Sequence, residues 1–250
     1  MAEAQKKQPA GIDALTLHIL AMLFMLCDHA WATVISGQEW LTAVGRLAFP
    51  IFAFMLAEGF RRTGSPKRYA LRLLVLALLS EIPFDLMYGA TVFYPFHQNV
   101  IWTFLIAMLC MWAISAVRKH GKILLTIPVC LIAAAVGYLA GRLLMTDYGG
   151  EGVLTVLLFY LFPGKTWWQK LFQTLGMIGL NCILLASLVI PVSLFGHTVE
   201  LPEQGLALLA LIPIWLYNGK QGYHSRCTRL ICYGFYPVHM LILALCMIYL

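Results

Sequence analysis

The sequence predicts an all-α fold: a polytopic transmembrane helical bundle of about 9–10 helices, in a single domain covering residues 1–250. Of these residues, 61% are hydrophobic and only 11% are charged, whereas about 25% are charged in an ordinary soluble domain. Mean hydropathy is +0.82, and long apolar runs recur from Leu15 to Leu250. Because so few charges cannot cover a soluble domain of this size, a soluble enzyme, a secreted disulfide scaffold and a disordered chain are excluded.

Nine apolar segments predict the membrane spans, since a spanning helix needs about 20 such residues. They are residues 14–36, 43–61, 69–88, 99–117, 122–144, 149–163, 171–195, 204–218 and 230–250. The sixth and eighth segments are short, so each can be a re-entrant segment instead. Gly and Pro residues break several connections, as at 64–66 and 163–164.

The first segment imitates a cleavable signal peptide, because two lysines precede it and Ala-Trp-Ala at 30–32 looks like a peptidase site. However, a polar Asp-His pair at 28–29 stands just before that site, and many more apolar segments follow. We therefore predict an uncleaved first helix.

Lysine and arginine residues indicate the orientation, because cytoplasmic loops are enriched in them. With the amino terminus in the cytoplasm, nine spans place 15 of the 17 Lys and Arg on the cytoplasmic side. These are Lys6, Lys7, Arg61, Arg62, Lys67, Arg68, Arg72, Arg118, Lys119, Lys122, Lys165, Lys170, Lys220, Arg226 and Arg229. Arg46 and Arg142 lie toward the outside. The net charge of +6 thus marks one membrane face, and we expect a lipid bilayer but no nucleic acid as a partner.

The seven cysteines lie mostly within apolar runs and form no Cys-x-x-Cys pair. We interpret them as small apolar packing residues. The histidines are scattered and lack the spacing of metal ligands, so no metal site is predicted.

Polar side chains inside spans are costly and usually functional, and most of them lie toward the outer ends of the predicted spans. These are Asp28, His29, Arg46, Glu81, Asp85, His97, Asn99, Asp147 and Glu151. His239 lies near the middle of the last segment, and Glu58 lies near the inner end of the second. The polar chemistry is therefore predicted to gather toward the extracytoplasmic face.

His29 is the strongest catalytic candidate, because a neutral imidazole in a dry site is available as a base at neutral pH. Asp28 points about 100° away around the helix, so it is not expected to orient His29 directly. Arg46, across a short outer loop, is the expected partner of Asp28. Such a buried pair can be catalytic or only structural.

One face of the first helix carries His18, Met22, Met25 and His29, at spacings of four, three and four residues. This stripe can line a narrow passage from the inner side to His29. The alternative is a methionine-rich packing face.

Residues 61–72 contain five cations in twelve positions, namely Arg61, Arg62, Lys67, Arg68 and Arg72. Topology alone explains a basic loop here, but the density suits an anionic ligand. Glu58 precedes Arg61 and Arg62 by three and four residues. It can form an ordinary helix ion pair, worth about 0.3–0.5 kcal/mol, or orient both arginines toward that ligand.

Several motifs resemble the TraX family of integral membrane proteins, named for the enzyme that acetylates the amino terminus of conjugative pilin. They are Met-Leu-Cys-Asp-His at 25–29, Gly-Arg-Leu-Ala-Phe-Pro-Ile-Phe-Ala-Phe at 45–54, Glu-Gly-Phe-Arg-Arg-Thr at 58–63, Tyr69 with Arg72, and Ser-Glu-Ile-Pro-Phe-Asp at 80–85. Shorter matches are Gln-Asn-Val at 98–100, Asp-Tyr-Gly at 147–149 and Phe-Tyr-Pro-Val-His at 235–239. The resemblance is dense over residues 15–105 and forms short islands beyond. Cys27 stands where the family more often has an aliphatic residue.

The resemblance implies a transmembrane acyltransferase in the bacterial cytoplasmic membrane, with the chain as one integral acyltransferase-like domain of about ten helices. Such enzymes take acetyl-CoA from the cytosol as a co-substrate and acylate an acceptor at the other face. The acceptor is not inherited: an amine or hydroxyl of a peptide, a sugar or a small molecule remains open.

The residues permit the following hypothesis for acetyl transfer. His29 takes the proton of the acceptor or carries the acetyl group briefly, while Asp28 and Arg46 hold the corner between the first two helices. Depth in the membrane suggests secondary roles for four more residues. Glu81 and Asp85 are candidates to orient His29 or to bind a cationic amine. Asn99 and His239 are candidates to donate a hydrogen bond to the developing oxyanion.

Acetyl-CoA would bind through the basic segment at the inner mouth. The predicted binding residues are Glu58, Arg61, Arg62, Lys67, Arg68, Arg72 and Tyr236.

Two other classes of protein also suit these residues. Outer-side carboxylates and histidines fit a proton-coupled transporter, although the chain lacks the internal repeat typical of many transporters. A scaffold without chemistry would tolerate Asn at Asp28 and Gln at His29 and Glu58.

Overall fold

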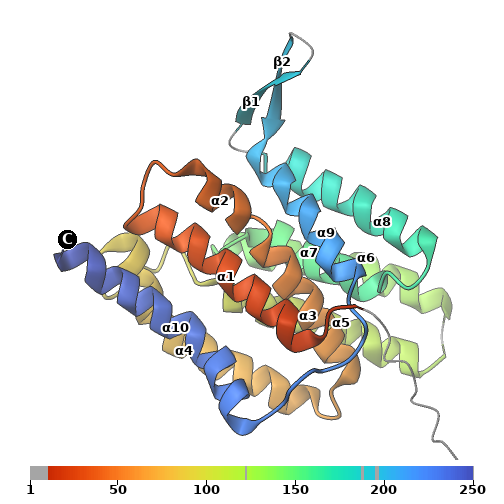
Figure 1. Ribbon diagram of the computed structural model, residues 1–250. Coiled ribbons are helices and arrows are strands. Elements are labelled where there is room, and N and C mark those ends of the chain that lie inside the picture. The colour runs from red at the N-terminus through yellow and green to blue at the C-terminus, as the bar shows by residue number, and fades with distance from the viewer. Residues whose placement is uncertain (1–10, 122, 187–188, 195–196, 250) are drawn as a thin grey trace, which may run out of the picture.

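The computed structural model describes residues 11–121, 123–186, 189–194 and 197–249, which form a helical bundle with one small hairpin (Figure 1). The helices are α1 (Ala14–Thr33), α2 (Glu39–Gly45), α3 (Ala48–Arg62), α4 (Pro66–Gly89), α5 (Val100–Lys119), α6 (Ile123–Leu143), α7 (Gly149–Leu161), α8 (Trp167–Ile178), α9 (Leu211–Trp215) and α10 (Arg226–Tyr249). A π-helical segment (Gly179–Leu184) extends α8, and a 3₁₀ segment (Glu203–Ala210) precedes α9. The predicted all-α class is confirmed. Lys6, Lys7, Lys122 and Leu250 lie outside the described residues.

Local sequence signals explain where the long helices begin. The Asp13 carboxylate accepts the backbone N–H of Thr16 at 2.8 Å and caps α1, and the Asn99 side chain accepts from Ile101 N at 3.0 Å and caps α5. Pro66 starts α4, where its missing N–H costs no hydrogen bond. The residues after each cap are apolar, so each helix continues into the bundle.

The centre of the bundle is α3, which packs against α1, α5 and α7. Within the described residues, five helical segments are long and apolar enough to cross a membrane: α1, α2 with α3, α5, α6 and α10. The most apolar stretch of α2–α3 is 61% buried inside the bundle, compared with 17% for α6. The predicted second span is therefore the core helix, whereas α6 presents most of its apolar surface outward, as a lipid-facing helix does.

The predicted span 171–195 is wrong in its second half. The helical part ends at Leu184, and β1 (Val189–Leu194) then pairs antiparallel with β2 (His197–Pro202). The strands are rich in β-branched residues, and Pro191 disfavours a helix here because it removes a backbone hydrogen bond. The hairpin projects beyond the helices, above α8 and α9 in Figure 1.

Two predicted segments are shorter than a full span. α7 has 13 residues, and the predicted span 204–218 becomes the 3₁₀ segment followed by the five-residue α9. At about 1.5 Å per helical residue, α7 is roughly 20 Å long, less than the hydrocarbon core of about 30 Å. Both short segments remain in the bundle, where α3 contacts each of them.

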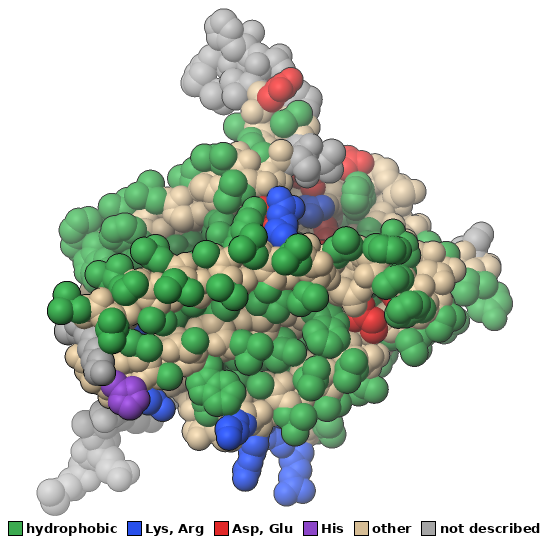
Figure 2. Space-filling view, turned by 180° about the vertical axis from the view of Figure 1, so that it is seen from behind, with side chains coloured by type: hydrophobic (Ala, Val, Ile, Leu, Met, Phe, Trp, Pro, Cys, Tyr) green, Lys and Arg blue, Asp and Glu red, His purple; other side chains and the backbone are tan. Residues whose placement is uncertain are grey.

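Successive segments run antiparallel, so the basic residues collect at one end. Arg62 donates to Gly219 O at 2.6 Å, Ala14 N donates to Lys220 O at 2.9 Å, and Arg61 donates to Phe159 O at 2.9 Å. These contacts join the ends of α3 and α7, the start of α1 and the loop between α9 and α10. In Figure 2, Lys and Arg side chains protrude along the lower edge of a mostly hydrophobic face, and a second group lies near the top of the view beside Asp and Glu. We call the end where the basic residues collect the inner end and the opposite one the outer end.

Candidate active site

A histidine pair joins α1 and α10 at the outer end. Nδ1 of His29 lies 2.7 Å from Nε2 of His239, and the ring planes differ by only 14°. Both side chains are buried, at 8% and 5% exposure. Nδ1 of His239 lies 2.7 Å from the carbonyl oxygen of Phe235. The two rings therefore meet edge to edge within a hydrogen-bonded chain that is anchored on the backbone of α10.

These hydrogen bonds determine which ring nitrogens carry a proton, because a carbonyl oxygen can only accept a hydrogen bond. Nδ1 of His239 must carry the proton that binds Phe235 O, which leaves its Nε2 as an acceptor in the neutral ring. Nδ1 of His29 then donates to that Nε2, and Nε2 of His29 keeps its lone pair. Neutral His29 is thus held in the tautomer that a general base or nucleophile needs.

Arg46 links three segments beside this pair. Its guanidinium lies 3.4 Å from Asp28 Oδ1 and 3.1 Å from Glu203 Oε1. Thr42 Oγ1 lies within 3.1 Å of both carboxylates and accepts from Arg46 Nη2. The expected Asp28–Arg46 pair is present, and Asp28 makes no hydrogen bond to His29 in the described chain. The second carboxylate was not predicted, because Glu203 falls one residue before the predicted span 204–218.

A close helix contact brings this pair together. A Cβ on Gly45 would lie 2.4 Å from the Cβ of Asp28, which is closer than any real Cβ contact. Glycine therefore lets α2 approach α1, and this approach places the Arg46 side chain over Asp28.

Asp28, His29 and Arg46 line an outer cavity of about 360 Å³. Its polar lining is Asp28, His29, Arg46, Tyr88, His97, Asp147, Tyr148, Gln204 and Tyr236. Within this cavity, Tyr148 stacks on Phe49 at 3.9 Å. His97 Nε2 lies 3.6 Å from Asp147 Oδ1, and this partner raises the pKa of His97 above its ordinary value. Both lie on loops at the outer end, which two backbone hydrogen bonds join: Gln98 N to Met145 O, and Asp147 N to Gln98 O.

Four predicted catalytic residues are not part of this cavity's lining: His239, whose ring bonds to His29, and Asn99, Glu81 and Asp85. Asn99 donates to Ala77 O at 2.9 Å and to Glu81, and Trp102 Nε1 donates to Glu81 Oε2 at 2.9 Å. With both its amide group and its cap oxygen occupied, Asn99 serves as a helix cap rather than a donor to reacting atoms. Glu81 likewise does not orient His29. Asp85 lines a neighbouring pocket instead.

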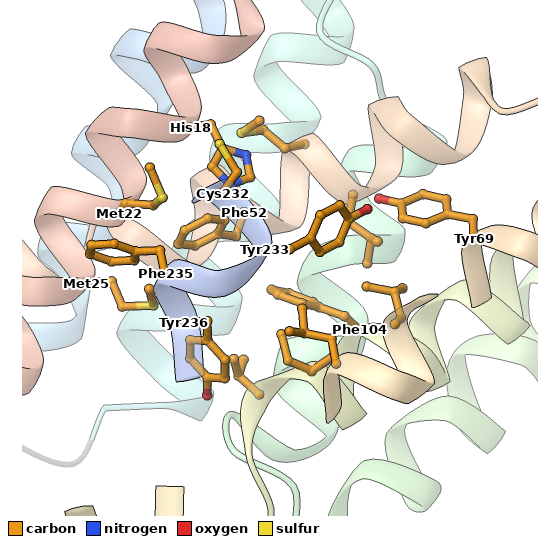
Figure 3. Close-up of a pocket in the computed structure, with 16 residues that line it drawn as sticks. His18, Met22, Met25, Phe52, Tyr69, Phe104, Cys232, Tyr233, Phe235 and Tyr236 are labelled. Atoms are coloured by element: carbon orange, nitrogen blue, oxygen red, sulfur yellow. The ribbon is translucent and has the colours of Figure 1, made fainter. Parts of the chain in front are cut away.

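A series of neighbouring cavities extends from the outer cavity to the inner end, and adjacent members share lining residues. An inner cavity of about 410 Å³ shares His18, Met55, Tyr69, Cys232 and Tyr233 with a narrower middle cavity of about 170 Å³, which we call the waist. The waist in turn shares Met25, Phe52, Val100, Phe104 and Tyr236 with the outer cavity. Side chains from α1 and α10 face each other across the waist (Figure 3).

The predicted stripe on α1 lines this route: His18, Met22 and Met25 lie in the waist, and Met25 with His29 lies in the outer cavity. Neighbouring cavities therefore lie along the predicted route from the inner side to His29. Helix spacing puts His18 and His29 about 16 Å apart along the axis.

The basic segment contributes less to the inner cavity than expected. Arg72 lines it, together with Arg229 and His224 from the start of α10 and the loop before it, which sequence reasoning did not select. Lys67 and Arg68 are exposed on the first turn of α4.

Glu58 binds both neighbouring arginines. Its two carboxylate oxygens lie 2.8 Å from Arg61 Nη2 and 2.5 Å from Arg62 Nη2. Arg61 also donates to the carbonyls of Phe159 and Tyr160 at the end of α7. Arg61 therefore links α3 to the end of α7. Arg62 and Glu58 line a further inner pocket of about 350 Å³.

The fold and site define a class: a polytopic helical membrane protein in which neighbouring cavities extend from a basic end to a buried histidine pair. The family described as TraX protein matches residues 14–247, so the chain belongs to the TraX family. It is 29% identical over 244 residues to the probable fimbrial assembly protein FimC, serogroup H1, of Dichelobacter nodosus, covering 92% of this chain and 94% of that protein. No solved structure matches the chain.

Proposed function

We propose that this protein is an acetyltransferase of the bacterial cytoplasmic membrane, which moves an acetyl group from cytosolic acetyl-CoA to an acceptor at the outer end. The observation that carries the proposal is the line of cavities between the basic inner end and His29. A nucleotide is too large and too charged for the apolar waist, whereas the slender thioester arm of acetyl-CoA suits it. Membership of the TraX family favours the same activity.

The inner cavity suits the charged part of acetyl-CoA. Arg72 and Arg229 line it, and guanidinium groups are the preferred protein donors to phosphate. Beyond them, the arm would pass Tyr69 and Tyr233 into the waist and bring the thioester toward Tyr236. Because Tyr236 lines both the waist and the outer cavity, it marks the point where donor and acceptor would meet.

At the outer cavity, the acceptor N–H or O–H loses its proton to Nε2 of His29 while its nitrogen or oxygen attacks the acetyl carbonyl carbon. The C–S bond then breaks, and the departing CoA thiolate takes up a proton. His239 keeps the lone pair of His29 directed into the cavity, and its hydrogen bond stabilises the imidazolium that forms. Arg46, held by Asp28 and Glu203, places a guanidinium group, a hydrogen-bond donor, beside the same cavity.

The acceptor is proposed to be an amine of a peptide. A fimbrial assembly protein of similar length and 29% identity favours a subunit of a surface fibre over a sugar. The carboxylates at the outer end also suit an amine better than a neutral hydroxyl.

The test is acetyl transfer by the purified protein in lipid nanodiscs, with radiolabelled acetyl-CoA and a peptide that has a free amino terminus. His29→Ala is expected to reduce the turnover number by about 10²–10⁴-fold, the usual contribution of a general base. His120→Ala, at the exposed end of α5, is the matched control and should keep full activity. Wild-type turnover in His29→Ala would refute the assignment.

A proton-coupled transporter is the second candidate, since the line of cavities and the His29–His239 hydrogen bond also suit a proton relay. Solute flux into proteoliposomes that depends on a pH gradient and needs no acyl donor would favour it. Acetyl transfer without such flux would exclude it.

A further inference from the structure

A side pocket of about 300 Å³ adjoins the outer cavity, and the mechanism above does not use it. It is lined by Phe84, Asp85, Tyr88, Gly89, Tyr94 and His97. Tyr88 and His97 also line the outer cavity, so these two side chains separate the two spaces.

The carboxyl group of Asp85 is only partly satisfied. Asp85 is 2% exposed, and its Oδ2 accepts the backbone N–H of Tyr94 at 2.8 Å. Its Oδ1 is buried and has no hydrogen-bond partner within the part of the chain that the structure describes. No Lys, Arg or His of the described residues lies within ion-pair distance of Asp85, and His97 pairs with Asp147 instead. A buried acceptor without a donor is rare in proteins and indicates a missing partner.

The walls of the pocket point to the chemistry of that partner. Phe84, Tyr88 and Tyr94 supply aromatic rings, and the rings of Phe84 and Tyr88 lie 4.9 Å apart. Aromatic faces attract cations, and a buried carboxylate binds an ammonium through a charge-assisted hydrogen bond. A neutral donor could satisfy the hydrogen bond of Asp85 but not its charge, and an anionic ligand would be repelled by it.

We propose that this side pocket binds an alkylammonium group of the acceptor, at Asp85 and between the aromatic rings, while a different atom of the acceptor receives the acetyl group at His29. This inference rests on the proposed function for the identity of its occupant. The Tyr88 ring lies 5.9 Å from the His29 ring and 5.9 Å from the His97 ring. The charge and the reacting atom are therefore separated by at least one aromatic side chain, and they cannot be the same group.

Binding of n-butylammonium tests the pocket without any acetyl transfer. Equilibrium dialysis of the wild-type protein in phosphatidylglycerol nanodiscs should show saturable binding, with 1-butanol as the neutral control binding at least tenfold more weakly. Asp85→Asn should weaken butylammonium binding at least tenfold. Its amide oxygen can still accept from Tyr94 N, so the fold is kept. Equal binding of butylammonium and 1-butanol, or unchanged binding in Asp85→Asn, would overturn the proposal.

Two further variants guard against a folding artefact. Tyr94→Ala removes a ring from a loop residue that is 45% exposed and should weaken butylammonium binding about three- to tenfold while leaving the backbone bond to Asp85. Glu39→Gln removes an exposed carboxylate at the same end and should bind like the wild type. If Glu39→Gln weakened butylammonium binding as much as Asp85→Asn does, the effect would be one of general surface charge, and the proposal would be overturned.

The source of the ammonium group is distinguished by lipid composition. Phosphatidylethanolamine also carries an ammonium group and is therefore a possible competitor. If the pocket serves the acceptor, adding this lipid to the nanodiscs should leave the affinity for butylammonium unchanged. Competition by phosphatidylethanolamine would assign the pocket to a lipid headgroup and overturn the acceptor role.

Kinetics separate this inference from the proposed function. For an acceptor peptide with a lysine beside its reacting amine, Asp85→Asn should raise KM at least tenfold and change kcat little. The KM for acetyl-CoA and for a peptide with norleucine in place of lysine should not change. Acetyl transfer with an unchanged KM would refute the side pocket alone, whereas butylammonium binding without any acetyl transfer would refute the enzyme alone.

Discussion

At the outer end of the bundle, Arg46 binds two carboxylates, Asp28 and Glu203, that come from different segments. At the inner end, one carboxylate, Glu58, binds two arginines of its own helix. The outer network fixes the relative positions of α1, α2 and the 3₁₀ segment, because Asp28, Arg46 and Glu203 each belong to a different one of these segments. The inner network neutralises little of the positive charge around it, so Arg72 and Arg229 remain available. The ion pairs at the outer end thus fix the positions of helical segments, while the inner end keeps a positive electrostatic potential.

The largest effect is expected from breaking the outer network. Arg46→Met leaves Asp28 and Glu203 without their cation, and removal of one partner from a buried ion pair costs about 3–5 kcal/mol. Thermal unfolding in detergent should show this loss, together with the loss of acetyl transfer. Lys67→Met, on an exposed turn at the inner end, should leave the unfolding temperature unchanged. Equal stability of the two variants would refute the contrast between the ends.

A smaller effect is expected at the inner end. Arg72 is exposed and lies 5.5 Å from the Tyr69 ring, so Arg72→Gln should keep the fold. It should raise the KM for acetyl-CoA about three- to tenfold, since a solvent-exposed charged contact contributes less than a buried one. Arg68→Gln is the matched control. A change in kcat rather than KM would show that Arg72 acts on the fold and not on acetyl-CoA.

The smallest effect concerns the rim of the outer cavity. Asp147 raises the pKa of His97, so the contribution of this pair to the free energy of unfolding is fully present below pH 6.5 and is lost as pH rises through the raised pKa. The His97 and Asp147 side chains are 41% and 30% exposed, so the contribution stays below about 1 kcal/mol.

Asp147→Asn should return the pKa of His97 toward its ordinary value in an NMR titration. An unchanged titration of His97 would show that Asp147 is not its partner.

Depth along each apolar segment predicted which end carries the site, because Arg and Lys residues orient the spans. The Asp28–Arg46 pair could also be predicted, since a short loop limits the distance between them. The His29–His239 contact could not, because 210 residues separate the two and periodicity does not say which helices become neighbours. The role of Asn99 was mistaken for the same reason: its position matched a site at the outer end, but its amide is occupied by Ala77 and Glu81.

The hairpin shows a different limit of hydropathy. Residues 189–194 are apolar enough to extend a span, yet they pair with 197–202 as strands. A sliding count of apolar residues cannot distinguish a lipid-facing helix from a short strand when β-branched residues dominate both.

The apolar waist has an electrical consequence. A membrane protein that opens cavities toward both faces risks conducting ions down the membrane potential. The waist also holds His18 and three tyrosines, but most of its lining is apolar and it contains no Asp, Glu, Lys or Arg among the described residues. Transfer of a bare ion into such a lining is unfavourable. The molecule can therefore keep openings on both sides while the membrane remains an insulator.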